Sequence, residues 1–102
     1  MRLKECKIAL EILGPEYKKM TFDLEPNCLF REFKDFDIEL GHYKKNYIIY
    51  VWYKGGAYGI ENVTSEYLLS ITNDLATSDD IKKTINYYQA KFNNHGRISQ
   101  WE

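Results

Sequence analysis

Residues 47–60 constrain the fold more than any other part of the chain. Two runs rich in aromatic and β-branched residues flank the pair Gly55-Gly56. Adjacent glycines can take the positive φ values that a two-residue hairpin turn requires. The segment therefore predicts a β-hairpin of two strands within an antiparallel sheet.

A turn at Gly55-Gly56 would set Tyr53 opposite Tyr58 and Trp52 opposite Gly59. Opposed residues share one face of a sheet, so this register divides the hairpin into two sets. The more apolar set, expected on the core side, is Ile49, Val51, Tyr53, Tyr58 and Ile60. The more polar set, expected on the outer side, is Tyr50, Trp52, Lys54, Gly59 and Glu61.

Alternating apolar and polar residues predict three earlier strands, over residues 5–12, 19–25 and 35–40. Gly14-Pro15 is the expected turn between the first two, which would pair as a hairpin, and Pro26-Asn27 is the expected turn after the second. Residues 29–33 have no clear periodicity.

Two helices are predicted after the strands. The first begins at Thr64 or Ser65 and runs to about residue 76, and the second begins near Thr77 and Asp80, which have capping-box spacing. The second ends at residues 93–96, and residues 97–102 are left unassigned. The expected core stripes are Leu68, Ile71 and Leu75 on the first helix and Ile81, Ile85, Tyr88 and Phe92 on the second.

Strands followed by helices predict an α+β fold: an antiparallel sheet of about five strands with two C-terminal helices packed on one face. The chain has 102 residues and contains no repeat or linker-like segment. We therefore expect residues 1–102 to form a single domain.

Charge and composition narrow the classes of partner. The chain has 14 basic and 15 acidic residues, and its basic pairs, such as Lys44-Lys45, are scattered along the sequence. Nucleic-acid binding is therefore not favoured. No apolar run is long enough to span a membrane or to form a signal peptide, so we expect no membrane association and a cytoplasmic location.

No pattern of catalytic, cofactor-binding or metal-binding residues is evident. Cys6 and Cys28 do not have zinc-site spacing, His42 and His95 are isolated, and the glycines do not follow a nucleotide-binding pattern. Whether the two cysteines form a disulfide stays open, although a cytoplasmic chain favours free thiols. We expect no enzyme activity, no cofactor and no metal.

The candidate partner-binding residues are expected on the outer sheet face. Asp35, Asp37 and Glu39 alternate along one strand, and the hairpin register places Tyr50 and Trp52 on the same face. Aromatic anchors surrounded by charge are typical of protein-binding sites. Two other interpretations stay open: the aromatic pair is packed by the tail or by residues 29–33, and the acidic residues are simply solvated.

These features predict a small non-enzymatic protein that occludes a macromolecular partner, of the immunity, inhibitor or phage counter-defence type. The alternative is a small-ligand or nucleotide-binding protein that stacks a ring on Tyr50 and Trp52, although we expect no marked concavity on this sheet face. A metal-dependent hydrolase centred on the carboxylates is the least favoured function. The same face could also pair with a second copy as a homodimer.

Overall fold

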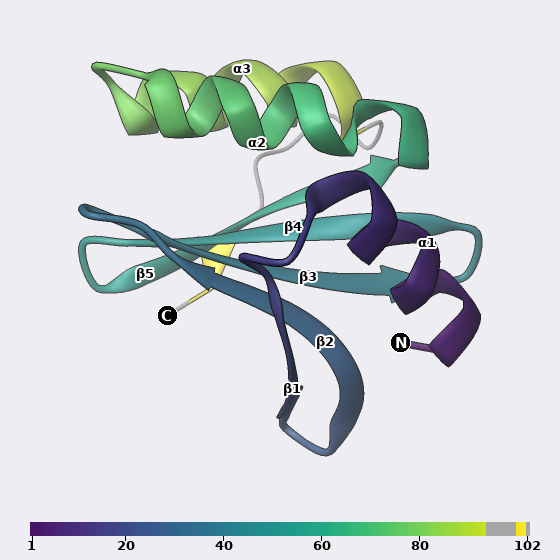
Figure 1. Cartoon of the computed structure of the whole chain (residues 1–102). Helices are drawn as coiled ribbons and strands as arrows, with labels where there is room; N and C mark the ends of the chain where they lie inside the picture. Colours follow the sequence, from purple (N-terminus) through teal and green to yellow (C-terminus); the bar gives the residue numbers. More distant parts are fainter. Residues whose placement is uncertain (94–99, 102) are drawn as a thin grey trace.

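The computed structural model describes residues 1–93 together with 100 and 101, and it confirms the α+β fold with an antiparallel sheet and two C-terminal helices packed on it (Figure 1). The sheet order follows the sequence, β1-β2-β3-β4-β5-β6, and β6 is a short strand beside β5. The strands are β1 (Lys18–Phe22), β2 (Glu25–Glu32), β3 (Asp37–Tyr43), β4 (Asn46–Tyr53), β5 (Gly56–Val63) and β6 (Gln100–Trp101). The helices are α1 (Leu3–Leu13), the 3-10 turn η1 (Ser65–Tyr67), α2 (Leu68–Thr77) and α3 (Ile81–Phe92).

The strand predicted over residues 5–12 is wrong, because this segment forms α1. Its buried residues are Cys6, Ala9 and Leu13, a spacing of three and four that defines one helical face. Ile8, which strand alternation would bury, is exposed. The segment is also rich in Leu, Lys and Glu, which favour helices, although its apolar residues fit both a strand and a helical period.

The second predicted strand pairs with a different neighbour from the one expected. β1 pairs with β2, through a turn at Asp23-Leu24. Both turn residues have positive φ values, 48° and 70°. The expected turn at Pro26-Asn27 is wrong because those residues lie within β2. β3 begins and ends slightly later than the strand predicted over residues 35–40.

The β4–β5 hairpin confirms the predicted division into two faces but not the predicted register. Tyr53 lies opposite Gly56 and Val51 opposite Tyr58, so the turn is Lys54-Gly55. The positive φ values fall on these two residues, 48° and 80°. The observed register differs from the expected one by two residues, and this even shift leaves the paired residues of 49–53 and 56–60 on their predicted faces. Lys54, predicted on the outer face, lies in the turn, and a further register shift follows between Tyr47 and Ile49.

The helices cover the inner face of the sheet through the predicted stripes. Leu68, Ile71 and Leu75 of α2 and Ile85 of α3 have no exposed surface. At the start of α3 the side chain of Asp80 accepts a hydrogen bond from the Lys83 backbone N–H at 3.1 Å. Thr77 does not cap this helix as predicted, because it ends α2 and donates to the Asn73 carbonyl.

At the C-terminal end of α3, two amide side chains form hydrogen bonds with backbone groups of β5. Asn93 accepts from the Glu61 N–H at 2.8 Å and donates to the Gly59 carbonyl at 3.3 Å. Gln89 donates to the same carbonyl at 3.0 Å. The Asn93 amide thus takes the place that a peptide group of a neighbouring strand would occupy. Residues 94–96 of the predicted helix stop, and most of the tail, lie outside the described residues.

Cys6 and Cys28 are both buried and free, so they do not form a disulfide. Burial raises the pKa of each thiol. Of the helices in the described residues, none is both long and apolar enough to cross a membrane.

Candidate functional site

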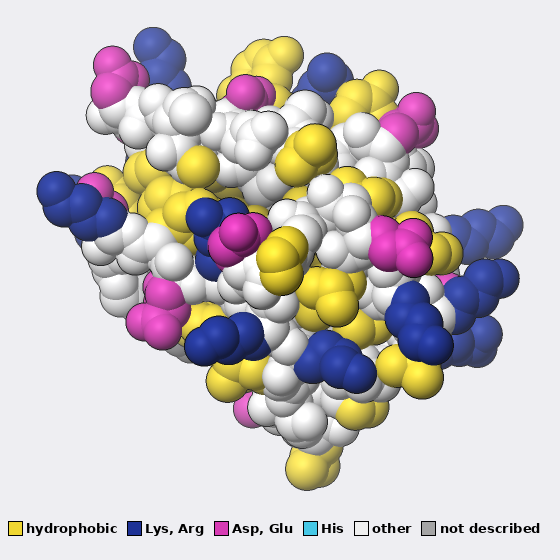
Figure 2. Space-filling view, viewed as in Figure 1, with side chains coloured by type: hydrophobic (Ala, Val, Ile, Leu, Met, Phe, Trp, Pro, Cys, Tyr) yellow, Lys and Arg dark blue, Asp and Glu magenta, His cyan; other side chains and the backbone are white. Residues whose placement is uncertain are grey.

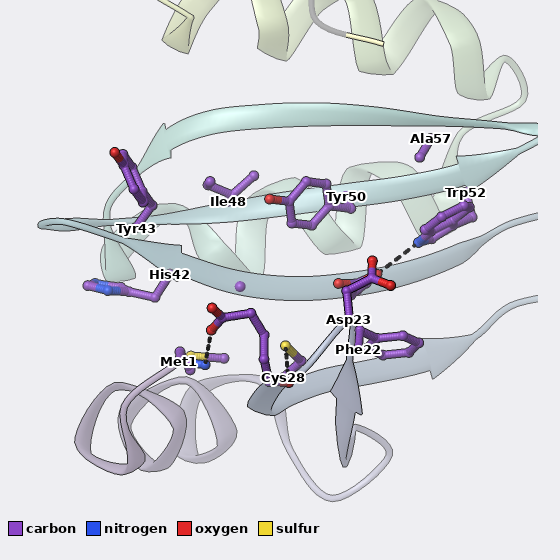
Figure 3. Close-up of a pocket in the computed structure, with 13 residues that line it drawn as sticks. Met1, Phe22, Asp23, Cys28, His42, Tyr43, Ile48, Tyr50, Trp52 and Ala57 are labelled. Atoms are coloured by element: carbon purple, nitrogen blue, oxygen red, sulfur yellow. Dashed lines mark hydrogen bonds and ion pairs between the residues drawn. The ribbon is translucent and has the colours of Figure 1, made fainter. Parts of the chain in front are cut away.

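The sheet face opposite the helices contains a hollow of about 510 Å³, which we call the outer hollow (Figure 3). Tyr50 and Trp52 reach it from β4, and Glu39 reaches it from β3. Phe22 and Asp23, at the tip of the β1–β2 hairpin, line its other side. The expectation that this face has no marked concavity is therefore wrong.

The hollow depends on the shape of the β1–β2 hairpin. The pairing of β1 with β2 shifts between Met20 and Phe22, an irregularity that bends a strand locally. The Phe22 ring then packs on Phe30 with 5.5 Å between ring centroids. Phe30 is the register partner of Glu39. Hairpin and sheet together therefore enclose a space that a flat sheet would not have.

Glu39 and Trp52 form the polar contact at the centre of the site. The indole Nε1 of Trp52 donates a hydrogen bond to Glu39 Oε1 at 3.2 Å, while 42% of the Trp52 surface stays exposed. Burial raises the pKa of the Glu39 carboxyl, the Trp52 hydrogen bond lowers it in part, and the nearby Asp23 raises it again. The ionised form of Glu39 is therefore incompletely stabilised.

Tyr50 lies beside this contact. It is opposite Glu39 in the pairing of β4 with β3 and opposite Gly59 in the pairing of β4 with β5. Burial raises the pKa of its hydroxyl most, followed by the charges of Glu39 and Glu61. Within residues 1–93, no lysine or arginine forms an ion pair with Asp23 or Glu39. The outer hollow therefore combines aromatic surface with an excess of negative charge.

The structure brings together most of the sequence-predicted site residues. Tyr50, Trp52 and Glu39 meet in the outer hollow, and Asp37 lies at the start of β3 opposite Trp52. Asp35 is separate, because it lies in the β2–β3 turn and lines a different hollow together with Lys54 and Asp80. Among the described residues, no group of three His, Cys, Asp or Glu side chains is suitably placed to hold a metal ion.

Sequence patterns did not reveal the contribution of the β1–β2 hairpin. Leu24, which strand alternation placed on the core face, lies at the hairpin tip and is 94% exposed. Its φ of 70° is in the left-handed region, which is unfavourable for leucine. Met20 and Tyr43 are further exposed apolar side chains near this face.

No family model, curated protein or solved structure matches this chain.

Proposed function

We propose that this chain is a non-enzymatic binding protein that holds a basic segment of a partner protein in the outer hollow and so occludes that segment. The observation that supports this most directly is the state of Glu39. Its carboxylate is partly desolvated, lies beside two aromatic rings and has no ion-pair partner among the described residues. An arginine or lysine side chain of the partner supplies the missing charge.

An arginine guanidinium fits the chemistry of the hollow best. It can stack on the face of Trp52 or Tyr50 while it donates hydrogen bonds to the Glu39 carboxylate. Such charge-assisted hydrogen bonds are stronger than neutral ones. Trp52 would thus be an anchor through its ring, and Glu39 would fix the orientation of the bound cation.

The exposed apolar side chains give the partner a second kind of contact. Leu24 at the hairpin tip and Met20 on β1 are both solvent-exposed in this chain. Covering them would bury apolar area beside the charged centre, the usual arrangement of an interface with a few dominant anchors. We therefore expect the bound segment to combine a cationic residue with neighbouring apolar residues.

A small cationic ligand is the second candidate, supported by the size of the hollow. A volume of about 510 Å³ lies within the range of small-molecule sites. The surrounding carboxylates favour a ligand with an amine or guanidinium and disfavour nucleotide phosphates. In this alternative Tyr50 and Trp52 stack on a ring of the ligand. In the protein-binding proposal the same two side chains stack on a guanidinium.

Selection from a random displayed-peptide library tests the proposal directly, because the library offers basic and non-basic segments alike. The wild-type chain should enrich peptides that contain Arg or Lys next to apolar residues. Binding of the enriched peptides should fall by about tenfold or more in Glu39→Lys, because the central attraction becomes a repulsion.

Glu11→Lys is the matched control. Glu11 is an exposed carboxylate on α1, and its substitution changes the net charge by the same amount as Glu39→Lys does. Its affinity for the enriched peptides should stay close to that of the wild type. Enrichment of peptides without basic residues, or equal loss in the two variants, would contradict the proposal.

A further inference from the structure

A second charged surface lies at the end of the sheet where the β3–β4 turn meets the start of α1. Arg2 and Lys4 from the helix start, with Lys44 and Lys45 from the turn, line one hollow of about 510 Å³. We call these residues the basic end. Figure 2 shows lysine and arginine side chains gathered on the side of the molecule where Figure 1 places this turn and α1. The fold thus brings together basic residues that are far apart in the sequence.

The hollow at the basic end is lined by more basic than acidic side chains. Glu5 is the one carboxylate among the residues that line this hollow. Within the described part of the chain, none of the four basic residues forms an ion pair. Gathered like charges create a local positive potential, although the chain as a whole has a net charge of −1.

Two turn lysines at the opposite end of the sheet provide an internal comparison. Lys34 lies in the β2–β3 turn and Lys54 in the β4–β5 turn, and Lys54 has a positive φ as Lys44 does. The hollow that they line also contains Asp35, Asp79 and Asp80. Lysines in turns are therefore common in this chain, but only those of the β3–β4 turn join a largely basic surface.

An exposed aromatic side chain of the neighbouring outer hollow lies beside the basic end, and a hydrogen bond between β4 and α1 supports this end of the sheet. Tyr43 is 64% exposed, and the Lys44 ammonium lies 5.4 Å from the centre of its ring. The Tyr47 hydroxyl donates to the Glu5 carbonyl at 2.7 Å, which ties β4 to α1 across the site. The His42 ring packs edge-on against Tyr47 with 4.8 Å between ring centroids.

We propose that the basic end binds a single-stranded nucleic acid, with Arg2, Lys4, Lys44 and Lys45 contacting phosphates and Tyr43 stacking on a base. Proteins that bind single strands combine a positive surface with exposed aromatic side chains in this way. The four basic residues do not line the outer hollow, but the two hollows adjoin, because His42 lines both and Tyr43 lines the outer hollow. The spacing of basic pairs along the sequence disfavours nucleic-acid binding, but spacing alone does not show which basic residues the fold brings together.

Fluorescence anisotropy with a dye-labelled oligothymidylate of about 12 nucleotides, a length within the range of single-strand sites, tests the proposal. At low salt the wild-type chain should bind, and its affinity should fall with added salt with a logarithmic slope of no more than about 3, for four phosphate contacts. Lys44→Glu with Lys45→Glu should lower the affinity by about tenfold or more, because two contacts become repulsive.

The double variant Lys34→Glu with Lys54→Glu is the matched control, because it changes net charge equally in turns at the other end of the sheet. It should lower the affinity by less than about threefold, the effect of net charge alone. Circular dichroism establishes that both variants are folded. Absence of binding at low salt, or equal loss in the two variants, would overturn the proposal.

Tyr43 separates single-strand recognition from general attraction to phosphate. Tyr43→Ala should weaken oligothymidylate binding by about fivefold or more, the effect of losing one stacked base, whereas Tyr43→Phe should retain it. Binding of heparin, which has negative charge but no bases, should be unchanged in both variants. Equally tight binding of a DNA duplex of the same length would overturn the assignment to single strands.

Discussion

The two faces of β4 differ in burial although their residues alternate along one strand. Ile49 and Val51 on the inner face have no exposed surface, and helices α2 and α3 cover this side of the sheet. On the outer face Trp52 keeps 42% of its surface exposed and bonds to a carboxylate. The difference indicates that the inner face stabilises the fold, whereas the outer face remains partly open to solvent, where we propose that a partner binds.

The inner face should show the largest effect on stability. Ile49→Ala should lower the free energy of unfolding by about 2–4 kcal/mol, because it removes buried methyl groups and leaves a cavity. Urea denaturation measures the change. Ile48→Ala, one residue away on the outer face, is the control and should cost clearly less. Similar losses in the two variants would remove the distinction between the faces.

The hairpin tip should respond in the opposite direction. Leu24→Gly should raise the free energy of unfolding by up to about 1 kcal/mol, because glycine takes positive φ without strain and Asp-Gly favours this turn. The same substitution should weaken binding of the selected basic peptides, because the exposed apolar contact is lost. Thermal denaturation and peptide titration measure the two effects. Higher stability with unchanged affinity would leave Leu24 outside the interface.

Trp52→Ala should separate folding from binding on the outer face. The side chain is half-exposed, so the substitution should lower the free energy of unfolding by about 1 kcal/mol or less. Affinity for the selected peptides should fall by about tenfold or more, as for an interface anchor. A loss of stability as large as that of Ile49→Ala would show that Trp52 belongs to the core.

The smallest effect concerns the protonation of Glu39. Because burial raises its folded-state pKa, the folded chain binds the proton more tightly than the unfolded chain does, and this contribution to stability is lost as pH rises through the folded pKa. Glu39→Gln should therefore be more stable than the wild type at pH 7, by less than about 1 kcal/mol since solvent screens the half-exposed group. The difference should shrink as pH falls through the ordinary glutamate pKa of about 4.3, because the wild-type carboxyl becomes protonated in both states. Thermal unfolding from pH 4 to pH 8 measures this, and a difference that grows toward pH 4 would contradict it.

The elements with one dominant pattern could be predicted from the sequence. The β4–β5 hairpin shows strand alternation around a glycine-containing turn, and α2 and α3 have helical stripes with a capping residue at Asp80. The assignment of Tyr50 and Trp52 to the outer face is correct although the predicted turn is not, because the register error is two residues and an even error does not exchange the faces. In α1 the apolar residues fit both periods, and burial against the rest of the core selected the helix.

The remaining parts of the sites depend on tertiary contacts that local patterns do not reveal. The turn at Asp23-Leu24 has no sequence signal, since leucine is rare at positive φ. Asp35 continues the alternation of Asp37 and Glu39 but precedes the strand, so the turn directs it to another hollow. The proximity of Arg2 and Lys44 arises only when α1 packs beside the β3–β4 turn.

The amide of Asn93 has a consequence for how this sheet can associate with other chains. Unpaired strand edges are sites where a foreign strand can add and where aggregation begins. On β5, Ala57 and Tyr58 pair with β6, while Gly59 and Glu61 bond to Asn93. An incoming strand would have to displace these partners to extend the sheet there. At the edge formed by β1, which has only five residues, Lys18 and Lys19 are both exposed and would repel a second copy that added there.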